Sequence, residues 1–202
     1  MKAVFIGLAV VLVLVFIGLW SRSVRAQDVM PVRVGQAAPD FTLRDQQGNP
    51  ITLSEFRDDH TVVLYFYPKD DTPGCTKQAC SFRDDLAQFQ SLHVRVLGVS
   101  IDGLEAHRAF SEKYKLTFPI LSDDSRQVSL AYGVLSRIAG FAYAKRTTFV
   151  IGADGTIRRI FTDVNPSKHT QELLDYLRNS LTPPTEGRDR PSVPASPASI
   201  RG

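Results

Sequence analysis

The sequence predicts an α/β domain in which helices flank a mixed central sheet, with an N-terminal hydrophobic helix outside the domain. Two observations predict the domain. Short runs of β-branched and aromatic residues alternate with segments whose apolar residues recur at helical spacing. A β-hairpin pattern and an amphipathic helix close this series. A third observation, an uncharged apolar run at the N-terminus, predicts the separate hydrophobic helix.

The N-terminal run extends from Ala3 to Trp20, about 18 residues that would span roughly 27 Å as a helix, near the thickness of a bilayer core. We expect residues 3–20 to anchor the protein in a membrane. A signal peptide is the alternative, because Val24-Arg25-Ala26 resembles a loose cleavage site. Residues 1–26 therefore predict either a membrane-associated protein with a single span or an exported one, in a periplasm or lumen.

The domain, residues 27–181, begins with a linker and a small hairpin. Phe41–Leu43 and Ile51–Leu53 are its strands, because a turn-forming cluster, Asp45–Pro50, separates them. Ser54–Phe56 predicts a single helical turn. Thr61–Tyr67 is apolar and β-branched throughout, as expected of a buried strand.

The middle of the domain alternates strands and helices. A helix follows Thr72, since Phe82, Leu86 and Phe89 recur at helical spacing. The next predicted elements are a strand, a helix, a short strand and a short helix: Val94–Ile101, Leu104–Tyr114, Pro119–Leu121 and Gln127–Tyr132.

The last elements are a hairpin and a helix. Thr147–Ile151 and Ile157–Phe161 flank the turn pair Asp154-Gly155, and Lys168–Leu181 is amphipathic. The Pro-, Ser- and Arg-rich residues 182–202 predict a disordered tail. This order of elements resembles the thioredoxin fold.

Both cysteines lie where the first core strand passes into a helix. Thr72 is a favoured N-cap residue and Pro73 suits the first helical position, so Cys75 becomes the third helical residue. Its sulfur would lie among free backbone N–H groups at the positive end of the helix dipole, an environment that stabilises a thiolate. The pattern predicts a reactive Cys75.

The spacing of the two cysteines limits how they can react. Five residues on an intact helix place the Cα atoms of Cys75 and Cys80 roughly 8–9 Å apart, whereas a disulfide needs less than about 7 Å. A disulfide between them requires the helix to unwind locally. This spacing argues against an ordinary Cys-x-x-Cys oxidoreductase.

The segment Pro68-x-x-x-Thr72-x-x-Cys75 resembles the active-site signature of the peroxiredoxins. With Cys80 five residues later, Tyr65–Cys80 is similar to the peroxiredoxin Q group, also called the bacterioferritin comigratory protein group. The resemblance extends over about residues 31–181 and includes Arg146, which stands where the family places its active-site arginine.

The resemblance implies a thiol-dependent peroxidase for hydrogen peroxide and organic hydroperoxides, with no cofactor and no metal. Cys75 would attack the peroxide and become a sulfenic acid, which Cys80 would resolve as an intramolecular disulfide; thioredoxin or a similar dithiol would reduce it. Arg146 would stabilise the thiolate and orient the peroxide, together with Thr72 and the N–H groups of Gly74 and Cys75. Pro68 would shield the sulfur.

The charge distribution argues against nucleic-acid binding. The net charge of +3 comes from the two ends of the chain, and the middle shows no basic face for nucleic acid. We expect Lys69, Asp70, Asp71 and Lys77 to be solvated charges at the rim of the site, and the four histidines (His60, His93, His107 and His169) to be surface or cleft residues.

Three other functions remain open from the residues alone. Membrane-anchored thioredoxin-fold copper chaperones, and thiol-disulfide redox proteins, also carry two nearby cysteines. The domain could also be structural, with a helix start that merely tolerates a cysteine. Because the resolving cysteine of the peroxidase interpretation lies in the same chain, that interpretation predicts a monomer.

Overall fold

The computed structural model describes residues 32–162 and 164–181. Its centre is a seven-stranded mixed sheet with the strand order β2-β1-β5-β4-β3-β8-β9. The strands are β1 (Thr42–Arg44), β2 (Pro50–Thr52), β3 (Thr61–Phe66), β4 (Val94–Ser100), β5 (Ile120–Ser122), β8 (Thr147–Ile151) and β9 (Ile157–Phe161). β3 pairs in parallel with β4 and antiparallel with β8. The predicted mixed sheet of a thioredoxin-like domain is confirmed.

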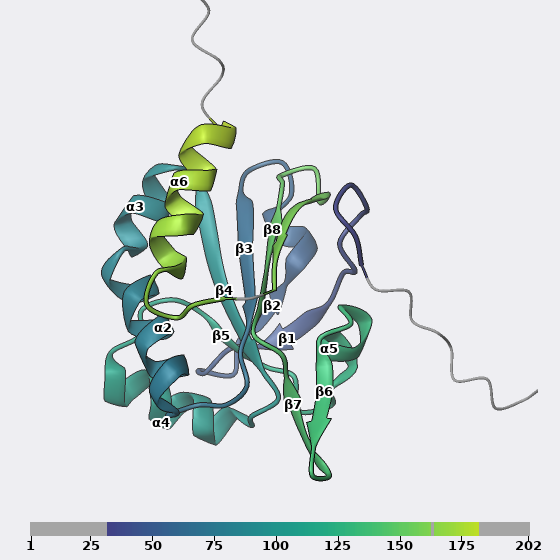
Figure 1. The fold of residues 1–202 in the computed structure, drawn as a ribbon, viewed down its shortest axis with the longest axis vertical. Helices are drawn as coiled ribbons and strands as arrows, with labels where there is room; N and C mark the ends of the chain where they lie inside the picture. Colours follow the sequence, from purple (N-terminus) through teal and green to yellow (C-terminus); the bar gives the residue numbers. More distant parts are fainter. Residues whose placement is uncertain (1–31, 163, 182–202) are drawn as a thin grey trace, which may run out of the picture.

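Helices cover both faces of this sheet (Figure 1). One face packs against α2 (Pro73–Asp84), α3 (Leu86–Ser91), α4 (Leu104–Tyr114) and α6 (His169–Leu181). The other packs against η1 (Leu53–Phe56) and α5 (Gln127–Ala131).

Side chains of β3 divide between these two layers, because successive residues of a strand point to opposite faces. Val63 and Tyr65 join the core under α2 and α6, whereas Val62 and Leu64 join the core on the other face. Every residue of β3 is buried, as its unbroken apolar sequence predicts. β3 is therefore the rigid base from which the cysteine-bearing segment departs.

One hairpin was not predicted. β6 (Leu135–Ile138) and β7 (Phe141–Ala144) pair with each other in a separate two-stranded sheet that projects from the domain (Figure 1). Their turn residues Ala139 and Gly140 both have positive φ, of 48° and 86°. Asn-Gly or Asp-Gly is the usual sequence for such a turn, so the Ala-Gly sequence does not predict a hairpin here.

The predicted membrane anchor at residues 3–20 lies outside the described residues, as does the tail at 182–202. Within residues 32–162 and 164–181, no helix combines the length and apolar character needed to cross a bilayer.

Candidate active site

The start of α2 carries Cys75 as predicted. Thr72 occupies the N-cap position and Pro73 is the first helical residue. The first intrahelical bond runs from the N–H of Thr76 to the carbonyl of Thr72, so the N–H groups of Gly74 and Cys75 have no partner within the helix. The Cys75 side chain is 2% exposed, and both cysteines are free thiols.

The Thr72 hydroxyl does not act as the expected cap. Thr72 Oγ1 donates a hydrogen bond to the carbonyl oxygen of Lys69 at 3.0 Å, inside the preceding loop, and makes no capping bond to α2. Its hydroxyl therefore supports the turn that leads into the helix.

Sheet register brings Arg146 to Cys75. Phe66, the last residue of β3, pairs with Thr147, the first residue of β8. Because the two strands are antiparallel, the residue before β8 lies at the end of the sheet where β3 stops and the chain continues toward α2. Arg146 Nη2 consequently lies 3.1 Å from the Sγ atom of Cys75. This geometry allows a guanidinium to stabilise a thiolate.

Gln78, a residue that was not predicted to belong to the site, also contacts Arg146. The other guanidinium nitrogen, Arg146 Nη1, donates to Oε1 of the fully buried Gln78. Gln78 follows Cys75 by three residues on the same helix, so α2 carries both the thiol and the amide that holds its cation. In the sequence, only the position of Gln78 three residues after Cys75 on a predicted helix indicated that its side chain lies near the thiol.

Other predicted residues lie around this centre. A Cβ at Gly74 would lie 3.4 Å from Arg146 Nη2, so the Gly74 backbone adjoins the guanidinium. Cys80 is half-buried on the same wound helix as Cys75. Pro68 is half-buried and lines a hollow of about 510 Å³ beside the β6–β7 hairpin, with apolar neighbours that include Ile101 and Phe141.

The prediction that all four histidines lie at the surface or in a cleft is wrong for His107 and His169, which are both fully buried. The Nε2 atom of His169 lies 2.8 Å from Thr148 Oγ1. Burial, and then the nearby charge of Arg146, lower the pKa of His169 to about 4, which keeps the ring neutral at pH 7. Each ring lies on the apolar face of its helix: His107 is three residues before Phe110, and His169 is four before Leu173.

The expectation of solvated charges is also wrong for Asp70, which is 8% exposed. Its neighbours Lys69, Asp71 and Lys77 are exposed as predicted. Asp70 turns inward because the Tyr67 hydroxyl and His107 Nδ1 contact its carboxylate, and its N–H donates to Asp102.

Tyr65 forms part of the wall beneath the site. Its ring stacks on Phe82 of α2, with the centroids 4.6 Å apart. Burial, and then the negative charge of a Cys75 thiolate, raise the pKa of Tyr65 well above its ordinary value. The tyrosine therefore stays neutral and presents an uncharged wall.

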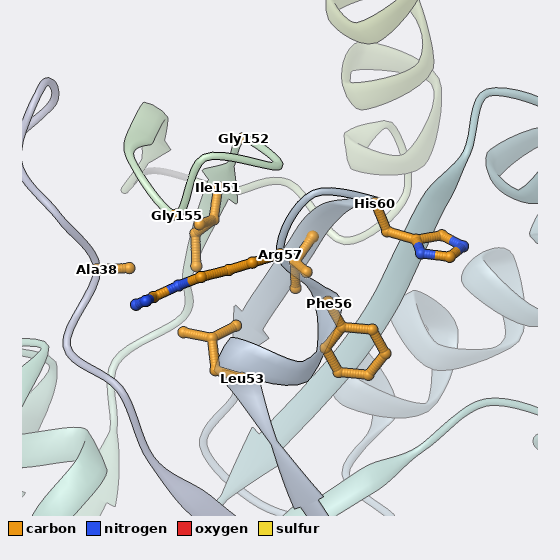
Figure 2. Close-up of a pocket in the computed structure, with 9 residues that line it drawn as sticks. Ala38, Leu53, Phe56, Arg57, His60, Ile151, Gly152 and Gly155 are labelled. Carbon is orange, nitrogen blue, oxygen red and sulfur yellow. The ribbon is translucent and has the colours of Figure 1, made fainter.

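A separate small pocket lies away from the cysteines (Figure 2). Its lining includes Ala38, Phe56 and His60, and the Arg57 side chain extends across it. The cavity of about 10 Å³ has room for about one water molecule. In the described part of the chain, no three His, Cys, Asp or Glu side chains form a group that could hold a metal ion.

Comparison with known proteins places this site in a family context. Residues 34–160 match the model of the AhpC/TSA family. The chain is 42% identical over 162 residues to a chloroplastic peroxiredoxin Q of Suaeda salsa, covering 80% of this chain and 75% of the relative. It is 43% identical over 159 residues to the chloroplastic peroxiredoxin Q of Arabidopsis thaliana, covering 78% and 73%.

Solved structures agree with these relatives. A cysteine-to-serine mutant of Xylella fastidiosa PrxQ superposes with a TM-score of 0.71 at 30% identity, over 75% of this chain and 98% of that one. Peroxidoxin BcpB of Mycobacterium tuberculosis gives a TM-score of 0.69 at 36% identity, over 73% and 97%. A Xanthomonas campestris bacterioferritin comigratory protein, whose structural title names alkyl peroxide reduction activity, gives 0.66 at 29% identity, over 70% and 92%.

Proposed function

This chain belongs to the AhpC/TSA family, among the peroxiredoxins of the Q group, and from that premise we propose that it is a thiol-dependent peroxidase with Cys75 as its nucleophile. The contact between Arg146 Nη2 and the Cys75 sulfur, 3.1 Å long, is the observation that supports this assignment best. A fixed cation beside the sulfur favours the thiolate over the thiol.

In the proposed first step, the Cys75 thiolate attacks the distal oxygen of a peroxide. A sulfur–oxygen bond forms and the oxygen–oxygen bond breaks. The sulfur is oxidised to a sulfenic acid that keeps the attacked oxygen and its hydrogen. The other oxygen takes up the proton that the Cys75 thiol released on forming the thiolate, and it leaves as water or an alcohol. Arg146 and the free N–H groups of Gly74 and Cys75 stabilise the developing negative charge on oxygen.

In the second step, the Cys80 thiol attacks the sulfur of the sulfenic acid, a disulfide forms, and the oxygen leaves as water. Both cysteines lie on the continuous helix α2, so the helix must open before the two sulfurs can meet. A thioredoxin-type dithiol then reduces the disulfide and is itself oxidised. Because the disulfide lies within one chain, a monomer can complete the cycle.

Two further assignments are part of this proposal. Thr72 and Pro68 surround the peroxide, an assignment that rests on their positions in the family motif. Residues 1–26 form a membrane span or an export signal, and the uncharged apolar run at 3–20 supports the membrane span. Residues 27–181 form the peroxidase domain. Fractionation with protease protection tests the membrane span.

Peroxide consumption by the cysteine variants tests the proposed function. Cys75→Ser abolishes turnover with a dithiol reductant. Cys80→Ser permits one oxidation, and mass spectrometry then shows Cys75 as a sulfenic acid. Tight Cu(I) binding with thiols that do not react with hydrogen peroxide would favour the copper-chaperone interpretation instead.

A further inference from the structure

The loop that leads into the active-site helix is fastened by a buried carboxylate. Asp70 lies between β3 and α2 and is 8% exposed. Its Oδ1 atom accepts a hydrogen bond from the Tyr67 hydroxyl at 2.7 Å, and its Oδ2 atom lies 2.7 Å from Nδ1 of His107 on α4. Both carboxylate oxygens are therefore occupied by groups from the domain core.

The backbone of Asp70 is fastened as well. Its N–H donates to Asp102 Oδ2 at 2.9 Å, and the same oxygen accepts a bond from the Ser100 hydroxyl. The carbonyl of Asp102 accepts a bond from Ser122 Oγ on β5. The loop is thus tied to the ends of β4 and β5 and to α4.

The ring of His107 makes its polar contact through one nitrogen. It is fully buried, and within the described residues its Nε2 atom has no hydrogen-bond partner. A proton on Nδ1 allows this nitrogen to donate to Asp70 Oδ2. A buried carboxylate that loses one of two partners is strongly destabilised, so the contact resists opening.

The residues after Cys75 are held differently. Their polar contacts depend on the helix itself: Gln78 reaches Arg146 only while α2 is wound. The Thr76 hydroxyl and the Gln78 amide nitrogen are buried without partners among the described residues. Unwinding α2 releases these groups to water, whereas unwinding the loop would strip Asp70 of its donors.

We propose that Asp70 and His107 are positioning residues that fix the upstream limit of this unwinding, so that α2 opens from its first turn while residues 67–72 stay in place. This inference rests on the disulfide of the proposed function. A fixed loop keeps the entry to the helix seated while Cys80 approaches, and α2 rewinds on the same base after reduction, which returns Cys75 to Arg146.

Amide hydrogen exchange on the full chain, reduced and oxidised, tests this limit. In the wild type, disulfide formation should raise the exchange of amides from Thr76 to Cys80 by about tenfold or more, while those of Tyr67 and Asp70 change by less than about twofold. A rise at Asp70 as large as the rise at Thr76 would overturn the proposal.

Variants that remove a hydrogen-bond donor to Asp70 should move the upstream limit of the unwinding. His107→Phe keeps the ring volume but removes the donor to Asp70, and Tyr67→Phe is a milder variant that removes a single hydroxyl. In the oxidised form of either variant, the Asp70 amide should exchange about tenfold faster than in the oxidised wild type, with a smaller change in the reduced form. A purely structural role would change both forms equally, and that result contradicts positioning.

Glu112→Gln is the matched control. Glu112 is an exposed carboxylate on α4, the helix that carries His107. This substitution should leave the limit unchanged, because an exposed carboxylate contributes little.

The oxidised state is prepared with hydrogen peroxide and verified by the mass lost when both thiol hydrogens leave. If peroxide does not form the disulfide, the proposed function fails. A chemical thiol oxidant then forms the disulfide, and the exchange limit is measured in the same way, which tests the positioning role separately.

Discussion

The buried amide oxygen of Gln78 lies 2.5 Å from Nη1 of Arg146, a residue 68 positions later in the chain. The same guanidinium donates to Cys75. Helix α2 therefore carries both Cys75 and the acceptor that orients Arg146, so opening the helix breaks both contacts. Thiolate stabilisation and helix winding are coupled by this arrangement.

Gln78→Ala should slow Cys75 oxidation by peroxide by about 10- to 100-fold, because a hydrogen bond to a charged group contributes about 1.5–3 kcal/mol. Stopped-flow measurement of thiol loss gives the rate constant. Gln90→Ala, at an exposed position on α3, is the matched control and should react like the wild type. An unchanged rate in Gln78→Ala would show that Arg146 needs no support from this amide.

Arg146→Lys retains a positive charge but loses the planar fork that contacts Cys75 and Gln78 together. We expect a loss of about 10- to 100-fold in the rate constant with peroxide, and about 10²- to 10³-fold for Arg146→Ala. The control is Arg158→Lys, since Arg158 forms an exposed ion pair with Asp154. A fully active Arg146→Lys enzyme would mean that charge alone suffices.

His169 makes folding stability depend on pH. Its folded pKa is about 4, whereas an unfolded histidine titrates near 6.5. Between these values only the unfolded chain binds the proton, so the free energy of unfolding rises with pH. The contribution is complete above about pH 6.5 and is lost as the pH falls toward 4, a difference of about 3 kcal/mol at most.

Urea titrations of the wild type and His169→Gln at pH 7, 5.5 and 4.5 measure this effect, with glutamine retaining a polar group for Thr148. The variant should lose less stability on acidification than the wild type. Parallel pH dependences for the two proteins would refute a neutral buried His169.

Gly98→Ala should destabilise the fold by about 1–3 kcal/mol, because the core has no space for a larger residue there. A Cβ at this position would lie 2.8 Å from the Tyr65 hydroxyl and 2.9 Å from Ile120 Cδ1. Chemical denaturation measures the loss of stability.

Tyr65→Phe should restore part of that stability in the double variant, since it removes a buried hydroxyl that has no partner within the described residues. Additive effects in the double-mutant cycle would show that Tyr65 is not the source of the clash.

Secondary structure follows closely from local pattern in this chain. The predicted helix at Leu104–Tyr114 and strands at Thr147–Ile151 and Ile157–Phe161 have the same bounds in the structure. In these segments the apolar residues recur at a single clear period. The hairpin at Leu135–Ala144 was missed because its turn lacks the usual residues and its strands carry mixed polarity.

The environment of single polar residues was harder to predict. Asp70 has the sequence context of a loop, where charged residues are usually solvated. His107 and His169 do share helical faces with apolar residues, a signal that the sequence contained and that predicts burial. Which partners would satisfy them could not be predicted, because Asp70 and His107 are 37 positions apart.

The sequence by itself determined the place of Cys75 at the start of a helix, because a helix start depends on neighbouring residues: Thr72, Pro73 and the strand before them. It also determined, through the five-residue spacing, that Cys75 and Cys80 cannot join on a wound helix. Only the tertiary structure placed Gln78 and Arg146 together at the sulfur, since that meeting depends on β8 pairing with β3 in one register. A register is set by contacts across the whole sheet, and no local period encodes it.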